Sequence, residues 1–430
     1  MASPKKITTG APAKGRRAVV VSGVRTPFVK AFGPYLKLDT IALGVHAVRG
    51  LLARTGIPRT AVETIVWGGV ILPPGSPNIG REIALDLGLP GMEGMTVTRA
   101  CASGLQAITA AVAMIERGDA DVIIAGGSDS TSNAQLVLPT HATHALAPLA
   151  FGKAGPAEII QVLSQLMPLS EILPQRPKIA ERSTGQVMGE AAEEMAARNG
   201  VSRESQDAFA VASHHRAAAA IASGRFDSEI VPVETREGAF VATDAMVRGD
   251  TSTEKLSKLR PVFAKRGTLT AGNSSPLTDG ASAVLLCSEE AAKALGLTPL
   301  AAFRSWAYVG VDPADQLLMG PALAIPKALD RAGLSLADMD FVDLHEAFAA
   351  QVLSVLKMMA SDAFCRERLG KDRAVGEVDP ARLNVHGGSV AIGHPFGATG
   401  ARMVTTMANE LARTGKPFAA LGICAAGGLG

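Results

Sequence analysis

The sequence predicts an α/β fold that consists of two similar halves, with a helical domain inserted in the first. Residues 18–22 are a β-branched run typical of a buried strand. An α-then-β unit with a glycine break at each end spans residues 101–132, and a second unit of this kind spans residues 397–422. Residues 132–266 between them are more polar and have the pattern of capped helices. These observations favour a duplicated fold with an insertion.

The two α-then-β units agree in spacing as well as in order. Gly104 and Gly126 are 22 positions apart, and so are Gly400 and Gly422. Few residues are identical between the units, so the duplication is indicated mainly by this shared period.

The insertion has its own signals. Ser202 opens a capping-like sequence before a helix around Phe209, and five prolines between residues 145 and 178 require short helices there. Residues 269–286 return to a strand-like composition, as if completing the first half. The expected parts are a disordered basic tail at 1–17, a first half at 18–131 and 267–296, an inserted loop domain at 132–266, and a second half at 297–430.

Composition restricts the class of protein. The chain has 42 basic and 40 acidic residues, a formal charge of +2, so we expect neither nucleic acid nor an anionic membrane as its main partner. The four cysteines lack CxxC spacing, which argues against a zinc or redox motif. No apolar stretch approaches the roughly 18 residues of a membrane span, and the start lacks a signal-peptide core. The cytoplasm is the expected compartment, with an organellar matrix as the alternative.

Two cysteines lie in small-residue sequences. Cys101 directly precedes a helical segment, whose positive end and free N–H groups would stabilise a thiolate, so we expect a lowered pKa and a nucleophile. A buried core thiol is the alternative interpretation, because cysteine is among the residues most often buried. Cys424 precedes a run of alanine and glycine that lets a ligand approach the backbone, and by itself it is typical of a core thiol.

Two histidines lie in motifs that suit catalysis. His394 stands in a glycine-rich turn before Pro395, as expected of a rigidly aimed base, and the unperturbed pKa of an imidazole is near neutrality. A structural turn histidine has the same pattern. His345 begins a His-Glu pair after a strand-like segment. Ala349 occupies the place at which a second histidine would complete a zinc-binding HExxH motif, so no metal is expected. The glycine pairs match neither of the common nucleotide-phosphate loops.

Four segments together resemble the thiolase superfamily, in an order and spacing that run through nearly the whole chain. They are RACASGLQA around Cys101, HEAFA from His345, GGSVAIGHPFGATGAR around His394, and CAAGGLG from Cys424. The resemblance implies two βαβαβαββ halves in five layers, α-β-α-β-α, with a loop domain inserted in the first half. It also implies an acyltransferase that cleaves or forms the carbon–carbon bond of a 3-ketoacyl-CoA. Coenzyme A would be a substrate, with no further cofactor.

The resemblance assigns a role to each reactive residue. Cys101 would be the acylated nucleophile, His394 its activator, and Cys424 the acid or base for the acetyl-CoA carbanion. The backbone N–H groups of Cys101 and Ala426 would hold the tetrahedral oxyanion. His394, with a group near His345, would hold the enolate oxygen.

The resemblance also bears on CoA binding and on subclass. Met188, Arg248 and Ser275 match positions at which the family contacts CoA, while Lys255 replaces a family serine and keeps a charge suited to phosphate. His345 stands where many thiolases have asparagine, and this form resembles the β subunit of the trifunctional complex of fatty-acid β-oxidation. A degradative 3-ketoacyl-CoA thiolase is therefore expected.

Three other functions compete with this interpretation. A biosynthetic acetoacetyl-CoA thiolase would share the same residues. A decarboxylating ketoacyl synthase would share Cys101 and both histidines, but it forms its carbanion by losing carbon dioxide and needs no second thiol at Cys424. A noncatalytic acyl-CoA or lipid carrier on the same scaffold has no need of all the reactive residues.

Partners follow from the same resemblance. It implies a homodimer or homotetramer and, through the β-subunit class, a hydratase/dehydrogenase α subunit. The insertion contains apolar residues at helical spacing, which pack onto the loop domain or form a surface for that subunit or for weak contact with a membrane. These residues are Ile159, Ile160, Val162, Leu163, Leu166 and Met167.

Overall fold

The computed structural model describes residues 15–150, 152, 155–165, 173–174 and 180–430. The chain divides into two compact units, one formed by the residues up to Ser132 together with Ala180–Gly430, and the other by Asn133–Ile179. The predicted insertion at 132–266 therefore spans both units, because residues 180–266 pack with the two halves. Most of the predicted basic tail lies outside the described residues.

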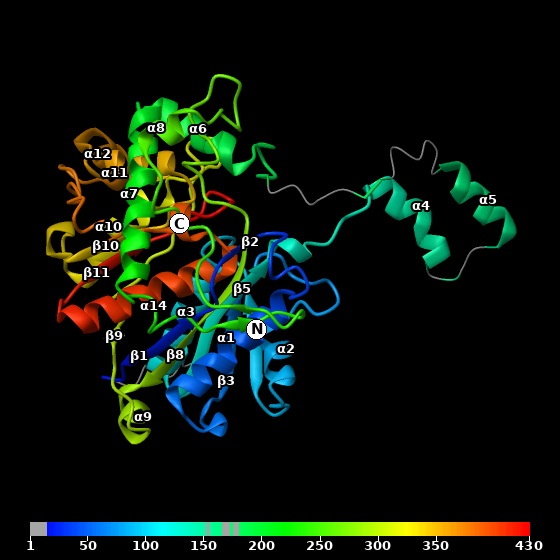
Figure 1. Cartoon of the computed structure of the whole chain (residues 1–430), viewed down its shortest axis with the longest axis horizontal. Helices are drawn as coiled ribbons and strands as arrows, with labels where there is room; N and C mark the ends of the chain where they lie inside the picture. Colours follow the sequence, from blue (N-terminus) through cyan, green and yellow to red (C-terminus); the bar gives the residue numbers. More distant parts are fainter. Residues whose placement is uncertain (1–14, 151, 153–154, 166–172, 175–179) are drawn as a thin grey trace, which may run out of the picture. The chain divides into compact units, whose positions relative to one another are not determined.

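The elements follow the order that the sequence predicts (Figure 1). The strands are β1 (Ala18–Arg25), β2 (Val29–Lys30), β3 (Thr64–Gly68), β4 (Glu93–Val97), β5 (Val122–Ser130), β6 (Val233–Glu234), β7 (Phe240–Val241), β8 (Thr278–Ser288), β9 (Ala301–Ala302), β10 (Phe341–Leu344) and β11 (Ala419–Gly422). The helices are α1 (Thr40–Thr55), α2 (Ile79–Asp86), α3 (Ser103–Arg117), α4 (Thr140–Ala150), α5 (Pro156–Gln165), α6 (Met188–Arg198), α7 (Arg203–Ala222), α8 (Thr253–Ser257), α9 (Glu289–Ala294), α10 (Gly320–Ala332), α11 (Ala349–Met359), α12 (Asp362–Leu369), α13 (Ser389–Ile392) and α14 (Phe396–Thr414).

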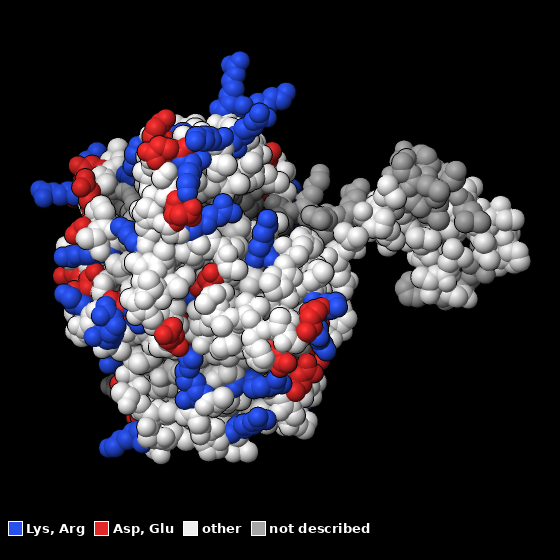
Figure 2. All heavy atoms as spheres, in the orientation of Figure 1, with Lys and Arg blue, Asp and Glu red and all other residues white. Residues whose placement is uncertain are grey.

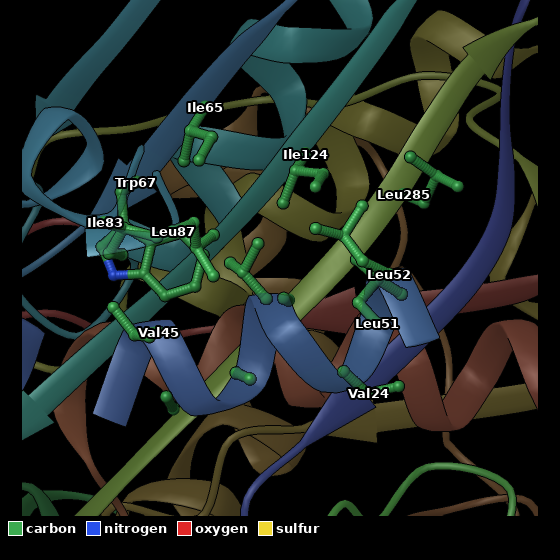
Figure 3. Packing of buried hydrophobic residues seen from close by; sticks show 14 of the residues in the cluster. Val24, Val45, Leu51, Leu52, Ile65, Trp67, Ile83, Leu87, Ile124 and Leu285 are labelled. Atoms are coloured by element: carbon green, nitrogen blue, oxygen red, sulfur yellow. The ribbon is translucent and has the colours of Figure 1, made fainter. Parts of the chain in front are cut away.

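The first half is a mixed sheet with the strand order β4-β3-β5-β8-β1-β9. Strand β3 is parallel to β4 and β5, whereas β8 runs antiparallel to β5 and β1. Successive side chains of a strand point to opposite faces, so on β5 Ile124 packs with α1 and α2 while Ile123 packs with α3 and α14. Figure 3 shows Ile124 and Leu285 on the α1 side with Leu51 and Leu52.

Helix α14 lies between the two halves. Fourteen of its nineteen residues are buried, because it packs against β5, β8 and β1 as well as against β10 and β11. Strands β10 and β11 are parallel, and α10 and α11 belong to the core cluster that contains them. The layers are therefore α1 and α2, the first sheet, α3 and α14, the β10–β11 pair, and α10 and α11. This is the expected α-β-α-β-α order.

The second half is less regular than the predicted repeat. Within the described residues its sheet contains β10 and β11, and the chain leaves β11 at Gly422 to form the loop that carries Cys424. The repeat is clearest in two pairs of elements, α3 with β5 and α14 with β11. Helix α14 begins at Phe396, directly after Pro395, which occupies the N-cap position.

The second unit contains the short helices α4 and α5, as the prolines predict. Val162 is buried there against Ala142, whereas Ile159 and Ile160 are exposed. Leu166, Met167 and the side chain of Leu163 lie outside the described residues. Among the described helices of the whole chain, none combines the length and the hydropathy that a membrane crossing requires.

Candidate active site

Glycines bring the two predicted catalytic motifs together. A Cβ atom on Gly104 would lie 2.3 Å from the carbonyl oxygen of Gly397, and one on Gly127 would lie 2.0 Å from the same atom. The N-terminus of α3, next to Cys101, therefore meets that of α14, next to His394, backbone against backbone. The glycines predicted as turn residues serve this close approach.

A buried carboxylate holds this contact in place. Asp129, at the end of β5, accepts hydrogen bonds from the backbone N–H groups of Gly397 at 2.6 Å and Ile71 at 2.6 Å, and from that of Val70. Burial raises the pKa of Asp129 to about 6, although these bonds oppose the shift. Sequence reasoning missed this residue because its partners come from distant segments.

Cys101 stands at a strained turn before α3. Ala100 has a φ of 45°, which is unusual for a residue other than glycine, and Cys101 remains partly exposed. The backbone N–H of Cys101 and that of Ala426 lie close enough to its sulfur to lower the pKa of the thiol. The two N–H groups proposed for the oxyanion therefore converge on the reactive atom.

The expected lowering of the Cys101 pKa is wrong for the resting site. Burial raises the pKa of the thiol to about 12, and Asp129 adds to the increase, while the two backbone hydrogen bonds oppose it. The cost of removing a thiolate from water is larger than the effect of these two backbone N–H groups. The resting cysteine is therefore a neutral thiol.

The two histidines lie against each other next to Cys101. Their ring centroids are 4.1 Å apart, and the Cys101 sulfur and one ring nitrogen from each histidine all lie within 4.8 Å of one another. Burial, together with the positive charge of Arg402, lowers the pKa of His394 to about 3. Burial, His394 and Arg402 hold the pKa of His345 well below its usual range. Both imidazoles are therefore neutral.

The same three residues bear on metal binding. Cysteine and histidine at this spacing can also be metal ligands, so the expected absence of a metal stays a prediction.

Hydroxyl groups orient both rings. Nδ1 of His394 lies 2.6 Å from Oγ1 of Thr399, and Nδ1 of His345 lies 3.0 Å from Oγ of Ser389. The Nε2 atoms of both rings have no hydrogen-bond partner within the part of the chain that the structure describes. Each ring is thus held from one side and leaves Nε2 for a substrate. Both hydroxyl residues lie inside the GGSVAIGHPFGATGAR motif, where a search for ring partners would have found them.

Cys424 follows β11, and its chain neighbours Ile423 and Ala425 belong to the core cluster against which Cys101 packs. Burial and the neighbouring Cys101 raise the pKa of the Cys424 thiol well above its usual value, so this sulfur is also protonated. The loop after it turns back on itself through the backbone hydrogen bonds between Ala425 and Leu429. The carboxylate of Glu181 accepts a 2.9 Å hydrogen bond from the N–H of Gly427 in the same loop.

Glu346, next to His345, anchors the segment that carries Ser389. Its buried carboxylate accepts hydrogen bonds from Ser213 at 2.7 Å, from Asn384 at 2.7 Å and from the N–H of Val390. Because these partners come from α7, the loop after α12, and α13, the carboxylate fixes three elements around the histidines. The sequence places Glu346 beside His345 but does not reveal these partners.

The three predicted CoA contacts lie at different depths. Met188 begins α6 and packs at the edge of the core cluster that contains Phe348 and Cys424. The N–H of Ser275 donates to the carbonyl of Ala347, which joins it to the His345 motif. Arg248 has an exposed side chain, and its N–H donates to Nδ1 of His214. Two of the three therefore adjoin the His345 motif, and Arg248 belongs to the outer part of the loop domain.

The buried neutral histidines predict that the fold loses stability in mild acid. In the unfolded chain His394 has its usual pKa of about 6.5, whereas in the folded chain its pKa is about 3. The unfolded chain therefore binds a proton more readily, and the free energy of unfolding decreases as the pH falls from about 6.5 to about 3. Between pH 7 and pH 5 we expect a loss of about 2 kcal/mol from this residue. Urea unfolding of the wild type and of His394→Asn at both pH values measures it. The buried carboxyls titrate in both proteins, so the difference in pH dependence isolates the histidine, and equal dependence would contradict the prediction.

Comparisons with known proteins agree with this site. The family model described as "Thiolase, N-terminal domain" matches residues 18–290, and "Thiolase, C-terminal domain" matches residues 297–430. A 3-ketoacyl-CoA thiolase from Yersinia pestis (strain Pestoides F) is 46% identical over 97% of this chain and 96% of the relative. The chain belongs to the thiolase family and is an acyltransferase of the thiolase fold.

Solved structures of relatives have the same fold. Human mitochondrial 3-ketoacyl-CoA thiolase in complex with CoA has a TM-score of 0.80 and 32% identity, covering 96% of both chains. The Bacillus anthracis acetyl-CoA acetyltransferase also has a TM-score of 0.80 and 32% identity, covering 96% of this chain and 97% of its own. The expectation of a thiolase is thereby confirmed. The two relatives are named for different reactions, one as a 3-ketoacyl-CoA thiolase and the other as an acetyl-CoA acetyltransferase.

Proposed function

We propose that this protein is a 3-ketoacyl-CoA thiolase, which uses CoA to cleave a 3-ketoacyl-CoA into acetyl-CoA and a shortened acyl-CoA in fatty-acid β-oxidation. The observation that carries the proposal is the convergence of Cys101, His345 and His394 within 4.8 Å, with Cys424 beside Cys101. A nucleophile, a base, an electrostatic donor and a second proton carrier are the groups that this reaction requires.

In the first step Cys101 attacks the 3-keto carbon while His394 takes the thiol proton. The thiol pKa of about 12 and the histidine pKa of about 3 disfavour a thiolate–imidazolium pair at rest, so proton transfer accompanies the attack. The N–H groups of Cys101 and Ala426, which both lower the pKa of the Cys101 thiol, would receive the oxyanion that develops.

In the second step the bond to the α-carbon breaks, and an acetyl-CoA enolate leaves. Cys424 gives it a proton, since its buried thiol is protonated and adjoins Cys101. His345 and His394 supply the donors for the enolate oxygen. The proton held by His394 returns Cys424 to its thiol form. CoA then removes the acyl group from Cys101, and His394 moves the proton of the CoA thiol to the sulfur of Cys101.

Coenzyme A is a substrate, and a basic surface suits its phosphates. Lysine and arginine side chains project around α8 and the loop that follows it (Figure 2). The exposed basic residues of this segment are Arg248, Lys255, Lys258, Arg260, Lys265 and Arg266. Lys255 forms an ion pair with Asp250, so part of its charge is already compensated. No further cofactor is required by the mechanism, and the composition favours the cytoplasm.

Chain-length preference tests the proposed subclass. We expect medium or long 3-ketoacyl-CoA substrates to be cleaved faster than acetoacetyl-CoA. The histidine form of the His345 motif resembles the trifunctional β subunit, and the insertion around residues 132–190 is long. Thiolysis rates across a series of acyl lengths, followed by the loss of ketoacyl absorbance, measure this. A maximum at the four-carbon substrate would favour the biosynthetic alternative, and no cleavage of any length would favour the carrier.

The second unit is the proposed surface for a hydratase/dehydrogenase subunit. Ile159 and Ile160 are 40% and 69% exposed on α5, more than packing within the unit requires. Deletion of residues 157–173 should abolish copurification with that subunit and leave thiolysis within about twofold, because the reactive residues lie in the other unit.

A point variant on α5 tests the exposed apolar surface without deleting residues 157–173. Ile160→Asp should weaken copurification, whereas a change at buried Val162 to alanine should act only through stability. Unchanged copurification together with unchanged liposome binding would refute a partner surface, and loss of liposome binding alone would point to a membrane. The oligomer, a homodimer or homotetramer by the family resemblance, is measured by light scattering on the same samples.

A further inference from the structure

Ser389 connects His345 to a buried positive charge. Its hydroxyl oxygen lies 3.0 Å from Nδ1 of His345 and 3.5 Å from Nη2 of Arg402, and these are its two side-chain partners within the described part of the chain. Arg402 is 1% exposed and lies 3.4 Å from the carboxylate of Asp343. Ser389 lies on α13, Arg402 on α14 and Asp343 on β10. The contact between Ser389 and Arg402 therefore depends on how the elements of the second half pack.

The chemistry of the guanidinium decides the direction of these hydrogen bonds. Arginine has five N–H donors and no acceptor, so Arg402 can meet only a lone pair of the Ser389 oxygen. The oxygen keeps a second lone pair, but the described residues offer the hydroxyl proton no other side-chain acceptor than Nδ1 of His345, so the hydroxyl donates to this nitrogen. A neutral imidazole that accepts at Nδ1 carries its own proton on Nε2.

We propose that Ser389 is a positioning residue: oriented by Arg402, its hydroxyl donates to Nδ1 of His345 and thereby keeps Nε2–H of His345 free to donate to a substrate oxygen. His394 takes the opposite tautomer. Oγ1 of Thr399 can accept a hydrogen bond from Nδ1–H of His394, which leaves the Nε2 lone pair as the base. The two adjacent rings thus act as one donor and one acceptor, although both are neutral.

This role rests on the proposed thiolysis, in which the enolate oxygen needs a donor when the carbon–carbon bond breaks. Burial supports it, because His345 has a pKa well below its usual range and so holds a single ring proton whose place matters. Acyl exchange between CoA and Cys101 forms no enolate. Loss of the Ser389 hydroxyl should therefore affect the two activities differently.

Histidine NMR on the ¹⁵N-labelled full chain tests the tautomer directly, with the His345 signals assigned by their absence in His345→Asn. In the wild type we expect Nδ1 of His345 without a proton and Nε2 with one. In Ser389→Ala we expect a mixture of tautomers. Thiolysis should then slow about ten- to a hundredfold, less than the 10²–10³ typical for loss of an oxyanion donor itself, with labelled-CoA exchange within about threefold of wild type.

Ser354→Ala is the matched control. Ser354 is a buried serine on α11 whose hydroxyl donates to the carbonyl of Met195, and its replacement should leave the tautomer and both activities unchanged. A proton on Nδ1 of His345 in the wild type would overturn the proposal. So would equal slowing of both activities in Ser389→Ala, or no slowing of either. If the wild type cleaved no 3-ketoacyl-CoA, the proposed function would fail, and the NMR result would still decide the tautomer.

Discussion

Cys424→Ser should cleave 3-ketoacyl-CoA about 10²–10⁴-fold more slowly than the wild type, the range typical of a lost general acid. In cleavage, the departing acetyl-CoA enolate must receive a proton inside the site, where Cys424 is buried and protonated beside Cys101. A serine hydroxyl has nearly the same shape, but it releases and recovers a proton far less readily than a thiol. Thiolysis of a 3-ketoacyl-CoA measures the effect.

Labelled-CoA exchange into an acyl-CoA separates the two steps in the same variant. Exchange uses Cys101, His394 and the two backbone N–H groups, so it should survive in Cys424→Ser and vanish in Cys101→Ala. Cleavage by Cys424→Ser at near the wild-type rate would remove Cys424 from the acid/base role. Equal loss of both activities, with normal folding, would assign Cys424 to acylation instead.

His394→Asn should lose thiolysis and acyl exchange together, each by about 10²–10⁴-fold. Asparagine can still form a hydrogen bond at this buried position, but its amide cannot take the thiol proton from Cys101. Because the thiol pKa is near 12, hardly any thiolate exists at neutral pH without such a base. Both assays used for Cys424→Ser measure the loss.

His144→Asn provides the matched control for this substitution. His144 is exposed on α4 in the other compact unit, so its replacement should leave both activities unchanged. If His394→Asn kept the wild-type rate of exchange, the base for Cys101 would have to be His345. The tautomers assigned to the two rings would then be reversed.

The raised thiol pKa also explains how a reactive cysteine can stay partly exposed. Oxidants and electrophiles react with the thiolate, and at neutral pH Cys101 is almost entirely thiol. In the proposed mechanism proton transfer to His394 accompanies the attack on a bound substrate, so the thiolate develops only when a substrate is present. The site therefore couples nucleophile activation to substrate binding.

The loop domain illustrates what the sequence could and could not predict. The prolines predicted short helices, and α5 does begin at Pro156, but Pro148 lies inside α4 and did not end that helix. The division of the chain after Ser132 and before Ala180 could not be predicted, because it depends on which surfaces residues 180–266 bury against the two halves.

The sequence by itself determined the family, and it supplied the reactive groups that are proposed here. Cys101, His394 and Cys424 lie in short motifs of glycine and other small residues whose order and spacing are informative without a structure, and the strand and helix periods reveal the α/β class. The tertiary structure alone decided the electrostatics of the site. Whether Cys101 is thiol or thiolate depends on burial by both halves, and the orientation of His345 depends on an arginine 57 positions away in the chain. Desolvation and hydrogen-bond direction arise from neighbours in space, so no local pattern could have contained them.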